Sequence, residues 1–208
     1  MFILFLYYLC FIFILIMATL QKSIEKKAAL VRATIHLVNN NGFHDTPMSK
    51  IAKMANVSPA TIYLYFDSKQ DLVNKTYLEV KETFTSYAFA TYNDQMNVKE
   101  GFEIIWKRIA DFKLKECEEA MFLAQCDNTP MIDESSRQEG IKHLQPLLQL
   151  WERGKQEGIL KPISDYLLYA YTINPLSFLM IMQQRSVFEL TKEHIEEAYQ
   201  AAWDSIKK

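Results

Sequence analysis

One stretch of this chain, residues 46–69 (TPMSKIAKMANVSPATIYLYFDSK), restricts its fold more than any other. It predicts two short helices joined by a tight turn. Thr46 precedes a proline, and this pair suits a helix start, because a Thr side chain caps free backbone N–H groups and proline tolerates the first helical position. Asn56 suits a left-handed turn. Ser58 also precedes a proline, so a second helix is expected to begin there.

The second helix is expected to present an outward face that suits DNA. If Ile62 points into the core, Ala60 and Leu64 lie near the opposite side of the helix. Thr61 and Tyr63 lie beside them. Methyl groups on such a face can contact thymine methyls in the DNA major groove. The arrangement is that of a helix-turn-helix, and an ordinary helical hairpin is the alternative.

Polar side chains around this face are expected to bind phosphate oxygens, which position a protein on DNA without reading its sequence. Tyr63, Tyr65 and Lys69 are the candidates for this role. The complete set of residues that we expect at the DNA interface is Thr46, Met48, Ser49, Ser58, Pro59, Ala60, Thr61, Tyr63, Leu64, Tyr65 and Lys69.

The order of these residues resembles the DNA-binding domain of the TetR family of bacterial transcriptional repressors. The resemblance covers residues 24–84. It implies an all-α fold, with a three-helix N-terminal domain, a helix-turn-helix motif at 48–67 and a helical ligand-binding and dimerisation domain at 85–208. It also implies three partners: a pseudo-palindromic double-stranded DNA operator, a second copy of the chain, and a small-molecule effector. The matching segments are NNNGF at 39–43, Thr46, IAKMANVS at 51–58 and TIYLYFDSKQDLV at 61–73.

The sequence departs from the family pattern at two positions of this motif. The family often has Arg where Ser49 stands, and a polar residue such as His or Asn is frequent where Leu64 stands. We therefore expect direct base reading to be weaker in this chain, or to be directed at thymine methyls.

The composition favours helices, and the distribution of charge suits DNA. The 208 residues include only five glycines and six prolines, and half of the residues are hydrophobic. These values support an all-α fold with a sizeable core. Residues 18–80 carry eight basic and five acidic side chains, a net charge of +3, whereas the remainder carries 15 and 20, a net charge of −5. A basic head on an acidic body suits DNA binding at one end.

Residues 1–17 (MFILFLYYLCFIFILIM) are all apolar or aromatic. We favour a wrongly assigned start, with translation from Met17, because this length is marginal for a membrane helix and no clear secretory signal is present. A membrane anchor and an apolar helix packed on the body are the alternatives. We therefore expect a cytoplasmic protein, or a membrane-tethered receptor-regulator if this segment is truly translated.

Apolar spacing and helix-breaking residues predict the other helices. The first is expected to end at Gly42 as a left-handed cap. A longer helix is expected to begin at Lys69, and Thr191 is the expected cap of the last helix. Pro146 and Pro175 are expected to kink or divide the helices that contain them. The expected helical ranges besides the motif are 21–40, 69–87, 98–112, 120–126, 132–157, 165–184 and 191–206.

Bulky apolar side chains in the C-terminal part are candidates for a ligand cavity, because aromatic and Met side chains suit adaptable binding sites. For each of them the alternative is a place in the ordinary core. An apolar or aromatic compound is the expected ligand. The candidates are Phe102, Trp106, Phe112, Met121, Phe122, Trp151, Tyr169 and Met180.

The last two helices carry apolar faces that suit a four-helix dimer interface, to which each chain contributes two helices. A dimer also places two recognition helices about 34 Å apart, as successive major grooves require. The alternative is that the same residues complete the core of a single chain. The candidates are Leu176, Leu179, Ile195, Ala198 and Ala202.

The sequence contains no recognisable catalytic or cofactor motif. A glycine-rich phosphate loop, GxSxG and HExxH are all absent. The four histidines are scattered and the cysteines form no CxxC pair, so oxidation sensing by Cys117 and Cys126, or a metal site that adds His143, is less expected than buried thiols. We expect a ligand-responsive DNA-binding repressor that is not an enzyme and has no cofactor or metal. A helical scaffold or enzyme is the alternative.

Overall fold

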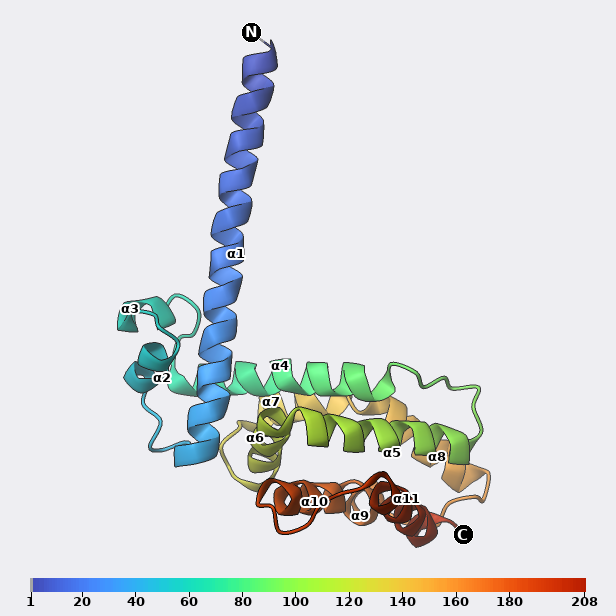
Figure 1. Cartoon of the computed structure of the whole chain (residues 1–208). Coiled ribbons are helices and arrows are strands. Elements are labelled where there is room, and N and C mark those ends of the chain that lie inside the picture. The colour runs from blue at the N-terminus through green and yellow to red at the C-terminus, as the bar shows by residue number, and fades with distance from the viewer. Residues whose placement is uncertain (1) are drawn as a thin grey trace. The chain divides into compact units, whose positions relative to one another are not determined.

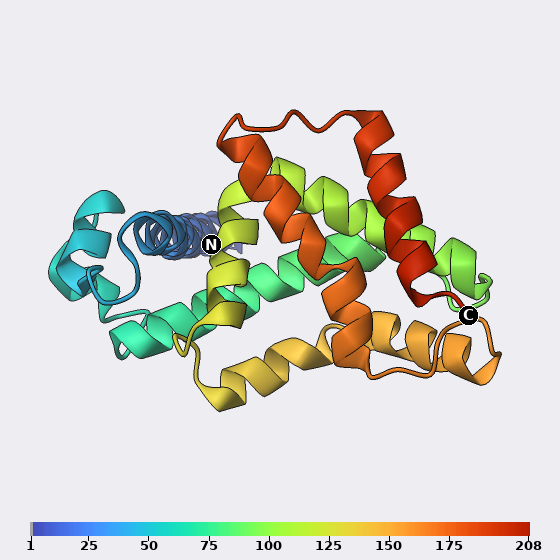
Figure 2. The same ribbon diagram turned by 90° about the horizontal axis from the view of Figure 1, so that it is seen from below.

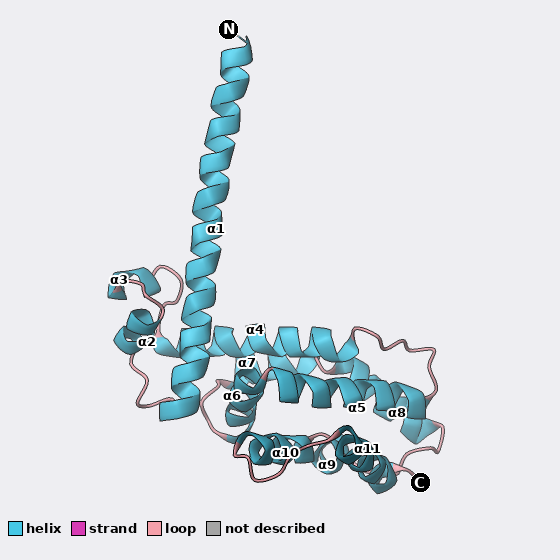
Figure 3. Cartoon of the chain, viewed as in Figure 1, coloured by secondary structure: helices cyan, strands magenta, loops and turns pink. Residues whose placement is uncertain are grey.

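A computed structural model of the chain describes the backbone of residues 2–208 and the side chains of residues 12–208. The described residues form helices, with one isolated antiparallel bridge between Leu160 and Lys207 (Figures 1 and 3), which confirms the all-α prediction. The helices are α1 (Phe2–Asn41), α2 (Met48–Met54), α3 (Pro59–Ile62), α4 (Lys69–Phe89), α5 (Val98–Lys115), α6 (Cys117–Asn128), α7 (Glu134–Lys142), α8 (Gln145–Gln156), α9 (Asp165–Thr172), α10 (Asn174–Gln184) and α11 (Lys192–Ile206).

The chain divides into two compact units. The first ends at Thr76, and the second runs from Tyr77 to Lys208. Helix α4 crosses this division without interruption. The domain boundary predicted between residues 84 and 85 falls eight residues later, on the same helix. Each unit has its own buried apolar residues.

The core of the first unit is built on the second half of α1. Apolar spacing predicts a helix at 21–40, and its apolar residues Leu30, Leu37 and Val38 are at most 4% exposed. Helix α1 packs against α2, and α2 packs against α3. Ile62 is buried in the same unit, as expected, and so is Phe66. The three-helix arrangement therefore rests on one continuous apolar cluster.

Helix α1 begins earlier than predicted, at Phe2 rather than near residue 21. Good helix formers and the absence of glycine and proline around residues 18–21 give the helix no reason to stop there. Gly42 has a φ of 76° and confirms the predicted left-handed cap. The side chains from Phe13 to Met17 are 49% to 63% exposed. Most of the predicted 1–17 segment has side chains outside the described residues. Within the described residues, no helix is both long and apolar enough to cross a membrane.

The second unit is organised around α5. This helix packs against α6, α8, α10 and α11, and Figure 2 shows α10 and α11 (orange and red) crossing it. Phe102 and Trp106 stack against Tyr199 and Trp203 of α11, with ring centroids 5.8–6.3 Å apart. The Trp106 indole N–H donates to the carbonyl of Thr172 at 2.8 Å. These contacts join α5, α9 and α11 into one core.

Two prolines divide helices where the sequence predicts a kink or a division. The expected helix 132–157 separates into α7 and α8, and Pro146 lies in the first turn of α8. The expected helix 165–184 separates into α9 and α10, and Pro175 lies in the first turn of α10. Proline fits these positions because first-turn N–H groups have no partner within the helix. Thr191 caps α11, as predicted.

Gly154 on α8 lies at a close contact that alanine is expected to disrupt. A Cβ atom there would lie 2.6 Å from Leu160 Cδ1 and 2.8 Å from Val98 Cγ1. Helix propensity alone would stabilise Gly154→Ala by up to about 1 kcal/mol. Overpacking costs more, so we expect the free energy of unfolding to fall by about 1–2 kcal/mol. Urea unfolding measures this, with Gln149→Ala on the exposed side of α8 as the control. A more stable Gly154→Ala protein contradicts the close packing.

Candidate nucleic-acid interface and internal cavity

The turn between α2 and α3 has the predicted geometry. Asn56 has a φ of 55°, which is the left-handed conformation. The N–H of Val57 donates to the carbonyl of Ala52 at 3.0 Å. Ser58 then caps α3, because its Oγ accepts a hydrogen bond from the N–H of Thr61 at 3.1 Å. These local contacts fix the direction in which the chain enters α3.

The surface of α3 and of the turn after it is formed by Ala60, Tyr63 and Leu64. Helix α3 ends at Ile62. The chain continues as a tight turn in which the N–H of Leu64 donates to the carbonyl of Thr61 at 3.1 Å. Ile62 is fully buried, whereas Tyr63 is 58% and Leu64 82% exposed. A turn of this kind follows nearly the same path as a helix, so these side chains keep the predicted outward direction.

Two of the predicted phosphate-binding side chains are held by contacts within the first unit. The hydroxyls of Tyr65 and Ser23 share a hydrogen bond of 3.1 Å. Lys69 Nζ donates to the carbonyl of His44 at 3.2 Å and lies 4.3 Å from the ring centroid of Phe43. Burial lowers the pKa of Lys69 below its ordinary value. Each side chain is thus oriented in the free protein.

Thr46 does not have the predicted role. Its side chain is fully buried, and its hydroxyl donates to the carbonyls of Leu37 at 3.2 Å and Gly42 at 2.8 Å. The cap of α2 is Pro47, which makes no side-chain cap hydrogen bond. The predicted Thr46 cap is therefore wrong, and because its side chain is fully buried, Thr46 does not reach DNA. The other predicted residues outside the outward face are exposed or half-buried: Met48, Ser49, Ser58, Pro59 and Thr61.

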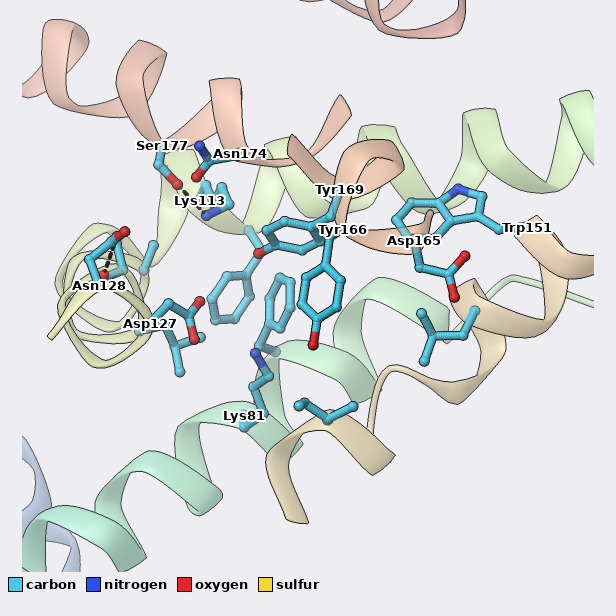
Figure 4. A pocket seen from close by; sticks show the side chains of 17 residues that line it. Lys81, Lys113, Asp127, Asn128, Trp151, Asp165, Tyr166, Tyr169, Asn174 and Ser177 are labelled. Atoms are coloured by element: carbon cyan, nitrogen blue, oxygen red, sulfur yellow. Dashed lines mark hydrogen bonds between the residues drawn. The ribbon is translucent and has the colours of Figure 1, made fainter. Parts of the chain in front are cut away.

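The second unit contains a cavity of about 440 Å³ (Figure 4). Its wall comes from helices α4 to α10. Phe112, Trp151 and Tyr169, three of the eight predicted cavity residues, line it. Phe84 and Leu123 add to the apolar wall. A volume and an apolar wall of this kind suit a small organic molecule.

The other five predicted cavity residues do not line this cavity. Phe102 and Trp106 belong to the aromatic core between α5 and α11. Phe122 and Met180 are at most 1% exposed, and Met121 is half-buried. The alternative, a place in the ordinary core, therefore holds for four of these residues: Phe102, Trp106, Phe122 and Met180.

The sequence-based predictions did not include two lysines of the cavity wall. Lys81 on α4 is 4% exposed, and Lys113 on α5 is 8% exposed. Lys113 Nζ donates to Ser177 Oγ at 2.9 Å. Burial lowers the pKa of Lys113 to about 8, although the charge of Asp127 acts in the opposite direction. A signal for Lys113 exists in the sequence, since it follows buried Ile109 by four positions and so continues the apolar stripe of its helix.

The predicted dimer residues fall into two groups. Leu176 and Ala202 are only 3% and 5% exposed, so they belong to the core of the second unit, as the alternative describes. More exposed apolar side chains occur nearby in the sequence, at Tyr171 on α9 (53%) and Phe178 on α10 (61%). The remaining predicted residues are half-buried: Leu179, Ile195 and Ala198.

The residues considered for a metal site or a redox role are not brought together. Within the part of the chain that the structure describes, no group of three or more His, Cys, Asp or Glu side chains is arranged to hold a metal ion. Cys117 and Cys126 are free thiols. Burial raises the pKa of the Cys126 thiol above its ordinary value, which disfavours the reactive thiolate.

Two family models match the chain, and together they cover most of both units. Residues 30–76 match the model described as bacterial regulatory proteins, tetR family. Residues 97–207 match the model described as tetracyclin repressor-like, C-terminal domain. The second match alone covers more than half of the 208 residues.

Individual proteins show the same similarity. An uncharacterized HTH-type transcriptional regulator of Haemophilus influenzae is 24% identical over 192 residues, which are 90% of this chain and 99% of that protein. The fatty acid metabolism regulator protein of Bacillus subtilis is 30% identical over 80 residues, 38% of this chain and 41% of that protein. The crystal structure of a TetR family transcription regulator from Marinobacter aquaeolei has a TM-score of 0.85 and 28% identity, and the match covers 90% of this chain and 98% of that one.

Proposed function

This chain belongs to the TetR family of bacterial transcriptional regulators, and we propose that it acts as a homodimeric, ligand-responsive repressor. In this proposal two copies bind a pseudo-palindromic double-stranded operator, and a small molecule in the cavity weakens that binding. The observation that carries the proposal is the exposed pair Tyr63 and Leu64, which follows directly on the fully buried Ile62.

The proposed DNA interface has two parts with different tasks. Ala60, Thr61 and Leu64 enter the major groove, where their methyl groups contact thymine methyls. Tyr65 and Lys69 bind phosphate oxygens, and their internal contacts orient them before DNA arrives. Groove contacts then set sequence preference, and phosphate contacts set position. The complete proposed interface is Met48, Ser49, Ser58, Pro59, Ala60, Thr61, Tyr63, Leu64, Tyr65 and Lys69.

Dimer formation is proposed through the last helices of the second unit. Regulators of this family bind DNA operators and dimerise. The half-buried Leu179, Ile195 and Ala198 retain surface that a second copy can cover, and Tyr171 and Phe178 offer larger exposed apolar groups. Two copies related by a two-fold axis read two half-sites of an operator that has the same symmetry.

The response to a ligand is proposed to pass through α4. Phe84 and Lys81 of this helix line the cavity, and the same helix begins at Lys69, beside the proposed groove-binding residues in the sequence. A ligand that contacts α4 shifts the population of DNA-binding conformations only if it binds those conformations less tightly than the others. The ligand then weakens operator binding by the same factor by which the operator weakens ligand binding.

The direct test is fluorescence anisotropy of labelled DNA from upstream of the protein's own gene, against scrambled DNA, at two salt concentrations. Tight and sequence-selective binding supports a local regulator. Weak binding to both DNAs with a steep salt dependence supports DNA binding with an operator elsewhere in the genome. No binding at low salt contradicts the proposal and favours a helical scaffold or enzyme.

Lys69→Met separates phosphate contacts from groove contacts in the same assay. We expect this variant to bind specific and scrambled DNA less tightly by a similar factor, about three- to tenfold. The slope of log affinity against log salt should become shallower by about one unit, because one phosphate contact is lost. Lys99→Met, an exposed lysine of α5, is the control. An unchanged slope removes Lys69 from the phosphate contacts.

A further inference from the structure

The cavity wall contains a buried cation that lacks a partner. Lys81 is 4% exposed, and its Nζ makes no hydrogen bond or ion pair with any residue that the structure describes. Its nearest recorded contacts are weak ones with aromatic rings, 5.8 Å from the centroid of Tyr77 and 6.0 Å from that of Phe84. A buried charge normally has a partner, because an unpaired one is costly to remove from water.

A second lysine lies at the same end of the cavity. Lys113 is 8% exposed and makes one hydrogen bond, to the neutral hydroxyl of Ser177. Figure 4 shows Lys113, Asp127 and Lys81 gathered at this end, whereas Asp165 lies toward the opposite end, near Trp151. The two ammonium groups repel each other, since the charge of Lys81 acts to lower the pKa of Lys113.

The charges at this end of the cavity do not balance. Asp127 is the acidic residue of the wall near the two lysines, and it is exposed to solvent. Asp165, the other acidic residue of the wall, is paired with Lys155 at 3.1 Å. Two lysines against one carboxylate leave a net charge of +1 when both lysines are protonated. One ligand anion therefore restores neutrality.

We propose that the cavity binds an amphipathic monocarboxylate, with its carboxylate held between Lys81 and Lys113 and its apolar body against Phe84, Phe112 and Tyr169. This inference rests on the proposed function, in which the cavity is the effector site. The carboxylate accepts charge-assisted hydrogen bonds from both ammonium groups, which are stronger than bonds to neutral donors. The apolar body fills a cavity of about 440 Å³ whose remaining wall is mainly apolar and aromatic.

Two matched pairs of compounds test the head group separately from the body. Decanoate and decan-1-ol share an aliphatic body, and 2-naphthoate and 2-naphthol share an aromatic one. Isothermal titration calorimetry of the full chain gives the affinity for each compound. We expect at least one acid to bind about tenfold or more tightly than its matched alcohol, because charge-assisted hydrogen bonds distinguish the two.

Two variants identify the groups responsible. Lys81→Met and Lys113→Met keep an unbranched side chain, one heavy atom shorter, and remove the charge. In each we expect the acid-to-alcohol affinity ratio to fall to within about threefold of one, while binding of the alcohol changes little. Lys99→Met, exposed on the same helix as Lys113, is expected to keep the wild-type ratio. Circular dichroism checks that each variant is folded.

The pH dependence of the wild-type protein is a second test that needs no variant. Lys113 faces Lys81 of α4, Asp127 of α6, Tyr169 of α9 and Ser177 of α10, and its pKa is about 8. The carboxylate of the ligand stays ionised throughout this range. Affinity for the acid should fall about tenfold between pH 7 and pH 9, as Lys113 loses its proton. Affinity for decan-1-ol, which stays neutral throughout this range, should not change.

The inference is overturned if the alcohols bind as tightly as the acids, if both lysine variants keep the wild-type ratio, or if none of the four compounds binds. An affinity for the acid that is constant from pH 7 to pH 9 removes Lys113 from the binding site and overturns the two-lysine arrangement. Anisotropy with DNA and no added compound measures the proposed DNA binding independently. A failure of the ligand proposal is thereby distinguished from a failure of the proposed function.

Discussion

Replacing Leu64 with aspartate is expected to weaken operator binding by roughly a hundredfold or more, which corresponds to about 3 kcal/mol. The side chain is 82% exposed, so the change removes almost no packing within the protein. In the proposed complex it removes a methyl contact in the major groove and places a carboxylate near phosphate charges. Stability should stay within about 0.5 kcal/mol of the wild-type value. Anisotropy and urea unfolding measure the two quantities.

The control for Leu64→Asp carries the same change in net charge at a distant position in the sequence. Gln149→Asp is exposed on α8, outside the proposed DNA interface, and should alter DNA affinity less than about threefold, since exposed charges that do not contact DNA are largely screened by salt. If Leu64→Asp binds the operator as tightly as the control does, Leu64 does not contact DNA and the proposed groove-binding face is wrong.

Replacing Lys113 with methionine is expected to stabilise the protein by about 2 kcal/mol at pH 7. Burial lowers the pKa of Lys113 from 10.5 to about 8, so its protonated form is less favourable in the folded state than in the unfolded state. Methionine fills a similar volume without a charge to desolvate. The gain is smaller than the pKa shift alone implies, because the hydrogen bond to Ser177 is lost.

The sign of the pH effect follows from proton binding. Between pH 8 and pH 10.5 the unfolded chain holds the Lys113 proton more often than the folded chain, so this residue makes wild-type stability rise with pH in that range. The advantage of Lys113→Met should therefore shrink between pH 7 and pH 9.5. Urea unfolding at both pH values gives the difference in the free energy of unfolding between variant and wild type. The contributions of other titrating groups are common to both proteins and cancel in this difference. A constant or growing advantage contradicts the buried, destabilising lysine.

Features that depend on a few neighbouring residues were predictable from the sequence. Ser58 caps α3 and Asn56 turns the chain because each acts through its own backbone and the next three residues. Pro146 and Pro175 lie at new helix starts for the same local reason. The outward direction of Leu64 followed from the burial of Ile62, which only requires helical spacing.

Features that depend on distant contacts were not predictable in this way. The hydroxyl of Thr46 has a better use than a cap, because the end of α1 presents two carbonyls to it. Trp106 does not line the cavity, because Tyr199 of α11 packs against its ring. Lys113 continues the apolar stripe of α5, but its place in a cavity wall beside Ser177 depends on how the neighbouring helices pack. Such outcomes are decided by which helices meet, and helical periodicity carries no information on that.

The most direct test of the central claim is selection of bound sequences from a random library of duplex DNA by the wild-type protein. We expect enrichment of an inverted repeat whose half-sites are centred about one helical turn apart or a multiple of it, because two identical recognition elements bind it. The same selection with Leu64→Asp should not enrich that repeat. Failure of the wild-type protein to enrich any sequence at low salt would contradict the account of this chain as a sequence-specific DNA-binding regulator.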